Sequence, residues 1–187
     1  MLKKFLIISG LILSAAFNCF AASSGTITLT VTVAPSIDIE VWYLDSGADT
    51  DVYDFGTLDV NKTTITVASI TVKNSSDGLV EDWYIRASDA QCVGTNWTLA
   101  SSTGTNQYEL EALLSGDDQP APSSFDGENL TTANQAMDVS NFADGENGEN
   151  VSPGSTRGLW FKISTPSEVS NSSEKTIWVT IVATQAG

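Results

Sequence analysis

Strict alternation of apolar and polar residues is the feature that most constrains the fold of this chain. In residues 26–33 every second side chain is apolar, and threonine fills the positions between. Because successive side chains of a β-strand point to opposite faces, this period of two predicts a strand with one buried face. Pro35 interrupts the pattern, which resumes in residues 37–41. The apolar positions of the two segments are Ile27, Leu29, Val31, Val33, Ile37, Ile39 and Val41.

Further candidate strands follow at short intervals. They are rich in β-branched and aromatic residues, which strands favour. Clusters of Asn, Ser, Asp, Gly and Pro separate them, as in residues 74–78 and 152–154, and such clusters indicate turns. The candidate strands are residues 63–72, 82–87, 158–163 and 176–183.

Residues 108–114 fit two structures. Asn106 and Glu109 are placed as the capping box of a helix, but the segment also alternates between apolar and acidic positions. Seven residues make a marginal helix and a strand of ordinary length, so we expect a strand.

Many short strands without an amphipathic helix predict an all-β fold, a single antiparallel β-sandwich of immunoglobulin-like or jelly-roll type. Residues 115–150 are the least periodic part of the chain and are rich in Asp, Asn, Gly, Ser and Pro. A loop of this length inside a compact domain is usually functional, so we expect variable surface features there. We expect residues 22–187 to form one β-sandwich domain.

The N-terminus has the order of a secretory signal peptide. Lys3 and Lys4 precede an apolar run, and small residues follow at Cys19 and Ala21. The run, residues 5–17, is too short for the roughly 20 residues of a membrane-spanning helix. We therefore expect cleavage after Ala21 and a secreted protein, located outside the cell, at the cell surface or in the periplasm. Cys19 also suggests a lipoprotein, but Phe17 and Asn18 replace the small residues that a lipoprotein signal requires.

Charge excludes one class of partner. Removal of the signal peptide takes away two lysines, so the mature chain has six basic and 23 acidic residues and a net charge of −17. Such a chain repels nucleic acid, whose binding requires clustered Lys and Arg. Cys92 is the single cysteine after cleavage and cannot form an internal disulfide. It is either a small packed side chain, or the site of an intermolecular disulfide or a reactive thiol.

Histidine is absent from the sequence. This removes Ser-His-Asp and Cys-His catalysis and the usual near-neutral general base. Paired carboxylates remain, but among 23 acidic residues nothing marks out one pair. We therefore expect no enzymatic activity and no cofactor other than calcium.

Two acidic runs are candidate calcium sites, because calcium takes carboxylate and carbonyl oxygens from a bent loop. Both runs surround glycines, but neither has the full pattern of a calcium-binding loop, so plain solvated loops are the alternative. The candidate ligands are Asp45, Asp49, Asp51 and Asp54 in the first run, and Asp144, Glu146 and Glu149 in the second.

Two segments resemble known families. Residues 53–58 read YDFGTL and residues 70–75 read ITVKNS. They are similar to the "DFGT…VxN" pattern of the choice-of-anchor-D and Hydin-like modules, which are secreted bacterial immunoglobulin-like β-sandwiches. Residues 151–162 read VSPGSTRGLWFK and resemble a group of uncharacterised exported bacterial proteins with a "PGxTRxLWFK" pattern. Ser75 and Ser76 depart from the first pattern, which has glycine at that turn. The resemblance implies a β-sandwich and leaves the function open.

Two functions from different classes are therefore expected. The first is a structural or assembly protein of the cell surface or matrix, such as a filament or surface-layer subunit, whose partners are other subunits, including copies of itself. The alternative is a monomeric carbohydrate- or calcium-binding module, with carbohydrate stacking on tryptophan. Residues 26–33 bear on the first function, because an N-terminal strand either pairs within its own domain or completes the sheet of a neighbour.

Overall fold

A computed structural model describes residues 36–187 except 46–47, 51 and 117. Residues Ala34–Gly187 form one compact unit, and the description concerns that unit alone. The expected signal peptide and the expected strand of residues 26–33 lie outside the described residues. The described part is built of β-strands and one short 3-10 helix, η1, Pro122–Phe125, so the expected all-β class is confirmed.

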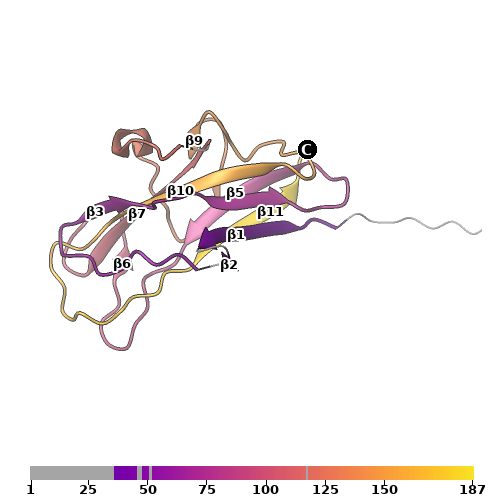
Figure 1. The fold of residues 1–187 in the computed structure, drawn as a ribbon. Helices are drawn as coiled ribbons and strands as arrows, with labels where there is room; N and C mark the ends of the chain where they lie inside the picture. Colours follow the sequence, from indigo (N-terminus) through magenta and orange to yellow (C-terminus); the bar gives the residue numbers. More distant parts are fainter. Residues whose placement is uncertain (1–35, 46–47, 51, 117) are drawn as a thin grey trace, which may run out of the picture. The chain divides into compact units, whose positions relative to one another are not determined.

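The larger of two sheets has the strand order β2-β1-β4-β10-β7-β6 (Figure 1), with β3 also paired to β10 and β9 to β7. Long neighbouring strands in this sheet are antiparallel. The bounds are β1 Ile39–Asp45, β2 Ala48–Thr50, β3 Thr63–Ile65, β4 Ile70–Asn74, β6 Thr98–Leu99, β7 Gln107–Ser115, β9 Ala143–Asp144 and β10 Thr156–Ser164.

The smaller sheet has the order β11-β5-β8, formed by β5 Glu81–Ala87, β8 Gln135–Ala136 and β11 Val179–Gln185. β11 pairs with β5 over its whole length in antiparallel register, from Val179 opposite Ala87 to Gln185 opposite Glu81. β8 pairs with the other edge of β5, so β5 is the central strand and β11 is an edge strand.

One hydrophobic core joins the two sheets. Alternate residues of β4 and β5 are buried, as the period of two requires. Trp83 and Ile85 of β5 meet Val72 of β4 and Leu159 and Phe161 of β10 in this core.

Most of the strand predictions are confirmed. Residues 82–87 and 158–163 lie in β5 and β10, and residues 108–114 lie in β7 as a strand. The strand predicted at residues 176–183 begins and ends later, as Val179–Gln185.

Two predictions need correction. The single strand expected at residues 63–72 is wrong, because β3 and β4 are separate strands that pair with the same neighbour, β10. The four residues between them lie opposite only two residues of β10, which interrupts the ladder as a bulge does. The expected purely antiparallel pairing is also wrong, since β6 and β9 run parallel to β7. These two-residue strands are supplied by loops rather than by hairpins.

Residues 115–150 cover β7 instead of forming only a variable surface. Four apolar side chains of this segment are fully or almost fully buried: Phe125, Leu130, Met137 and Phe142. Phe125 packs with Leu113 and Trp160 in a second small cluster, separate from the main core. β7 is therefore buried on both faces.

Candidate functional site

β11 and the start of β1 leave one side of the unit incompletely covered. We call this surface the open side and define it by Ile37, Ile39 and Val41 with Val179, Ile181 and Ala183. β1 and β11 belong to different sheets but lie next to each other (Figure 1). Among the described residues each is an edge at this point, because there β11 pairs only with β5, and β2 pairs only with the last three residues of β1.

The main chain of β11 has hydrogen-bonding groups along its free edge. In an antiparallel pair, the main-chain groups of successive residues point alternately to the partner and away from it. The bonds Ser88 N to Trp178 O (2.9 Å) and Ala186 N to Val80 O (2.9 Å) show that the even-numbered residues face β5. The outward-directed groups therefore belong to Val179, Ile181, Ala183 and Gln185, and no described residue forms a hydrogen bond to them on that edge.

The side chains of the open side are apolar and only partly buried. Val179, Ile181 and Ala183 pack against the main core but keep intermediate exposure. On β1, Ile37 is 43% exposed and Val41 is 39% exposed. The core thus reaches solvent between the two edge strands, whereas the corresponding side chains of the central strand β5 are buried.

β11 has none of the features that usually protect a free edge. Natural edge strands avoid pairing with other chains by means of charged side chains, proline or bulges. The seven residues of β11 read VTIVATQ and contain no charge, no proline and no glycine. In a chain with 23 acidic residues, this strand is an uncharged site for main-chain pairing.

Buried polar groups fix the point at which β1 begins. Glu81 is fully buried, and its carboxylate accepts from Trp83 Nε1 (2.9 Å) and from the main-chain N of Asp38 (3.3 Å). The carbonyl of Asp38 accepts from Ser75 N at 2.8 Å. The open side therefore has a fixed border at the start of β1.

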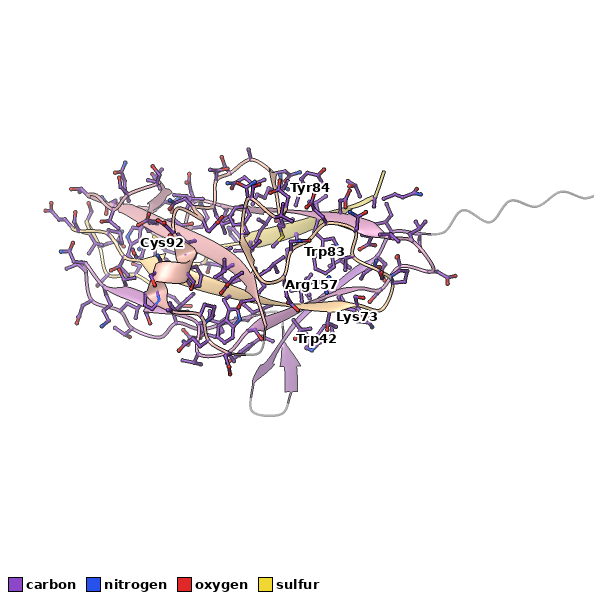
Figure 2. All side chains as sticks on the ribbon, turned by 90° about the horizontal axis from the view of Figure 1, so that it is seen from above. Trp42, Lys73, Trp83, Tyr84, Cys92 and Arg157 are labelled. Carbon is purple, nitrogen blue, oxygen red and sulfur yellow. The ribbon has the colours of Figure 1, made fainter. Side chains whose placement is uncertain are left out.

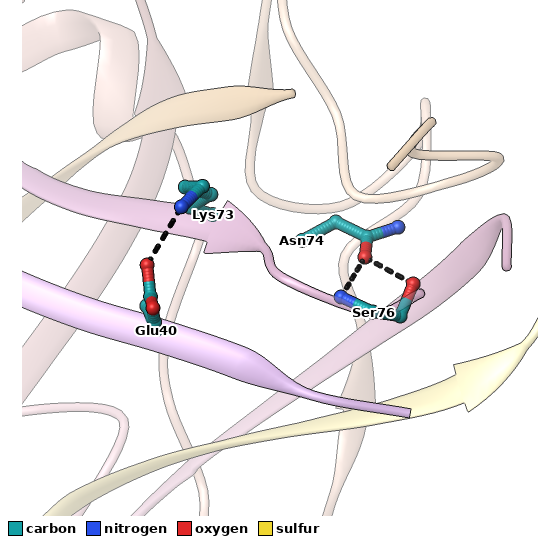
Figure 3. Close-up of polar contacts among 4 residues, drawn as sticks. All are labelled: Glu40, Lys73, Asn74 and Ser76. Carbon is teal, nitrogen blue, oxygen red and sulfur yellow. Dashed lines mark hydrogen bonds and ion pairs between the residues drawn. The ribbon is translucent and has the colours of Figure 1, made fainter. Parts of the chain in front are cut away.

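Asn74, at the end of β4, organises the neighbouring turn. Its side chain is fully buried and donates to the carbonyls of Leu79 and Val151, both at 2.8 Å. Its Oδ1 accepts from the main-chain N of Ser76 (2.9 Å) and from the Ser76 hydroxyl (2.5 Å) (Figure 3). All the bonds of this amide are internal, so its role is structural.

A shallow hollow that is open to solvent is lined by Glu40, Val41 and Trp42 of β1 and by Lys73 of β4. Trp42 and Lys73 lie close together there (Figure 2). Lys73 Nζ forms an ion pair with Glu40 Oε2 at 2.8 Å and lowers the pKa of that carboxyl (Figure 3). An exposed ion pair beside one tryptophan provides no array of groups for catalysis.

The second acidic run does not converge on one point. Asp144 accepts from Ser115 Oγ (3.4 Å), Glu146 from Gly158 N (3.4 Å) and Glu149 from Val139 N (3.3 Å). In the first run, Asp54 accepts from Gly56 N at 2.7 Å. Asp51 lies outside the described residues, as do the side chains of Asp45 and Asp49. In the part of the chain that the structure describes, no three acidic or cysteine side chains are grouped as metal ligands. The calcium sites stay predictions.

The remaining candidates are separate from the open side. Cys92 is a free, partly exposed thiol that donates to Thr95 O at 3.2 Å, far from Lys73 (Figure 2). Of the tryptophans, Trp83 and Trp160 are buried, whereas Trp178 is 57% exposed. Trp178 precedes β11 and lies on the outer face of its sheet. Within the described residues, no helix has the length and apolar character needed to cross a membrane.

Sequence reasoning missed the open side. The alternation of residues 176–183 predicts a strand but gives no sign of which strands end a sheet. The absence of charge in VTIVATQ was the available signal. Comparison with known proteins adds no identity, since neither a family model nor a curated protein matches the chain.

Proposed function

We propose that this protein is a secreted, non-enzymatic β-sandwich that serves as a structural or assembly subunit of the cell surface or extracellular matrix. The open side carries the proposal. It combines a free, uncharged strand edge with apolar side chains that are left half-covered. An edge of this kind is a template for pairing with another chain.

The charge of the chain supports an assembly through strand edges. At a net charge of −17 after signal cleavage, mature subunits repel one another at long range. Contact between them needs attraction that does not depend on opposite charges. Main-chain hydrogen bonds and apolar burial supply it, and β11 offers both without a charged residue.

The absence of histidine supports a non-enzymatic role. In addition, the buried polar side chains at the open side, Glu81 and Asn74, are satisfied by internal hydrogen bonds. They hold the start of β1 and the following turn rather than facing a cavity.

Particle size tests the proposal. The mature chain, residues 22–187, is studied by size exclusion over a wide range of concentrations and by negative-stain microscopy. We expect polymers or higher oligomers whose population grows with concentration. A monodisperse monomer at every concentration would contradict the assembly function.

A matched pair of valine substitutions connects any assembly to the open side. Val41→Asp places a charge on the open side, and we expect it to reduce assembly. Val93→Asp makes the same change at a residue that is 94% exposed, in the loop that carries Cys92, and we expect assembly to persist. Equal loss in both variants would show that the open side is not the contact.

A further inference from the structure

We propose that the open side is completed by residues 26–33 of a second copy of this chain, added as a strand along the free edge of β11. The inference rests on the proposed assembly function and names its partner and contact. It follows from the fit between a described edge and a segment of the chain that lies outside the described residues.

The free edge of β11 and residues 26–33 agree in length and in residue pattern. The free edge of β11 offers outward main-chain groups at Val179, Ile181, Ala183 and Gln185, over a strand of seven residues. Residues 26–33 are eight residues that alternate without interruption. In a strand added at this edge, one face points to the core, as the odd-numbered side chains of β11 do.

The apolar face of residues 26–33 matches what the open side lacks. Its side chains are Ile27, Leu29, Val31 and Val33. On the added strand they would cover the half-exposed side chains of β1 and β11, including Val41 and Ile181. The threonines would continue the outer face of the small sheet, where Thr180 and Thr184 already lie.

Charge also agrees. Residues 26–33 contain no ionisable side chain, and neither does β11. In so acidic a chain, these two uncharged strands can approach each other without bringing carboxylates together.

The connection to β1 favours a neighbouring copy as the source of the strand. Pro35 fixes its own φ and disfavours the helical region for Ala34, so the sequence predicts an extended path into β1. β1 itself is held at Asp38 by Glu81 and Ser75. We therefore propose that an extended connection of this kind leads the preceding segment to a neighbouring copy rather than back to its own domain.

Cysteine cross-linking identifies the segment that pairs with the free edge of β11. In a mature chain with Cys92→Ser, one protein carries Thr30→Cys and a second carries Thr180→Cys, Val182→Cys or Thr184→Cys. Thr180, Val182 and Thr184 lie on the outward face of β11, and Thr30 belongs to the polar face that the alternation predicts for residues 26–33. Side chains on adjacent strands come within disulfide range. We expect a heterodimer, identified by mass after mixing and oxidation, for at least one of the three acceptor positions.

A single chain that carries Thr30→Cys together with the cysteine on β11 shows whether the added strand comes from the same chain or from a second copy. Disulfide-linked oligomers support exchange between copies. A disulfide that closes within the monomer overturns the inference, because residues 26–33 then pair in their own domain. The absence of any cross-link overturns it as well.

A matched pair on the donor strand tests the predicted face. Leu29→Asp charges the apolar face, and we expect the concentration needed for assembly to rise at least about tenfold, since burial of one leucine corresponds to that factor or more. Thr28→Asp makes the neighbouring residue acidic on the outward face, and we expect a change of less than about twofold, because no buried surface is lost. Equal effects would refute the assignment of faces.

The outcomes distinguish this inference from the proposed function. Polymers that form without the cross-link leave the assembly function standing and remove the strand exchange. A monomer at every concentration, with no intermolecular cross-link, removes both.

Discussion

Replacement of Asn74 tests whether the buried turn at the end of β4 stabilises the fold as its hydrogen bonds indicate. The amide donates twice, to Leu79 O and Val151 O, and accepts twice, from Ser76. Asn74→Asp keeps the size and the acceptor but replaces the amino group with an oxygen that faces two carbonyls. Asn74→Ala removes all four bonds.

The expected magnitude follows from those contacts. An ordinary internal hydrogen bond contributes about 0.5–1.5 kcal/mol net, and a buried polar group without a partner costs about 1–3 kcal/mol. Asn74 is fully buried, so water cannot replace the lost partners. We expect each substitution to lower the free energy of unfolding by about 2–5 kcal/mol, a large part of the roughly 5–15 kcal/mol of an ordinary domain.

Equilibrium unfolding in guanidinium, followed by tryptophan fluorescence, measures the effect, because Trp83 is buried near this turn. The exposed Asn134 provides the control, since Asn134→Asp and Asn134→Ala should each change stability by less than about 0.5 kcal/mol. We also expect Asn74→Asp to recover part of its loss in acid, where the carboxyl becomes protonated and can donate to one carbonyl. A loss below about 1 kcal/mol at neutral pH would refute the structural role of this amide.

Three further predictions concern the interior of the larger sheet. Burial raises the pKa of Glu111 above its usual value of 4.5, and its ion pair with Lys162 (2.5 Å) only partly opposes this. The folded protein therefore holds this proton more tightly than the unfolded chain, so the stability of wild type relative to Glu111→Gln should fall as the pH rises above the ordinary glutamate pKa of 4.5 in unfolding experiments. No pH dependence of the difference would contradict this. Gly158→Ala would bring a Cβ within 2.6 Å of a main-chain oxygen of β7, and we expect a loss of about 1–3 kcal/mol in thermal or chemical unfolding rather than the small gain usual for glycine to alanine in open space. Tyr108→Phe removes a buried hydroxyl that donates to a main-chain carbonyl at 2.5 Å, and should cost about 1–3 kcal/mol by the same assay, whereas an unchanged stability would show that the carbonyl finds another donor.

Periodicity predicted the strands well because it is a local property. β5 and β10 lie where alternation placed them, and β7 formed a strand despite its capping-box pattern. The pairing of β7 with β10 explains why this segment is a strand and not a helix. Six residue pairs join the two strands, whereas an isolated helix of seven residues is only marginally stable.

The features that sequence alone did not predict depend on contacts between distant segments. The break between β3 and β4 exists because both pair with β10, and no residue from 66 to 69 is a strong strand breaker. The buried side chains of residues 115–150 have irregular spacing, so no periodicity marks them. Asn74 looks like an ordinary turn residue, and its bond to the distant Val151 carbonyl could not be predicted from the sequence.

Whether a strand lies at the centre or at the edge of its sheet also cannot be predicted from its alternation. β5 and β11 have the same alternation and are paired with each other, yet one is buried at the centre and the other is half-exposed at the edge. A given residue type contributes differently to stability in a central strand and in an edge strand. The neighbouring strands, rather than intrinsic preference, decide how far a strand is buried. An uncharged strand sequence is a signal for a candidate interaction surface of this kind, but the topology is needed to place that strand at an edge.

The acceptor edge of the proposed contact needs little further ordering. The acceptor edge is held in place, because β11 is registered on β5 and the start of β1 is fixed by Glu81. Fixing the backbone of eight donor residues on this edge costs about 1–2 kcal/mol for each residue, or about 8–16 kcal/mol. Burial of four apolar side chains contributes about 6–12 kcal/mol, and new bonds, two at each of the four free positions of β11, add about 4–12 kcal/mol, whereas the loss of translational and rotational freedom costs a further amount of about 4–15 kcal/mol. These sums nearly cancel, which predicts an association that is weak, depends on concentration, and is weakened at least about tenfold by the loss of a single apolar side chain of the donor. A contact that survived Leu29→Asp unchanged would have to draw its stability from surfaces other than this strand.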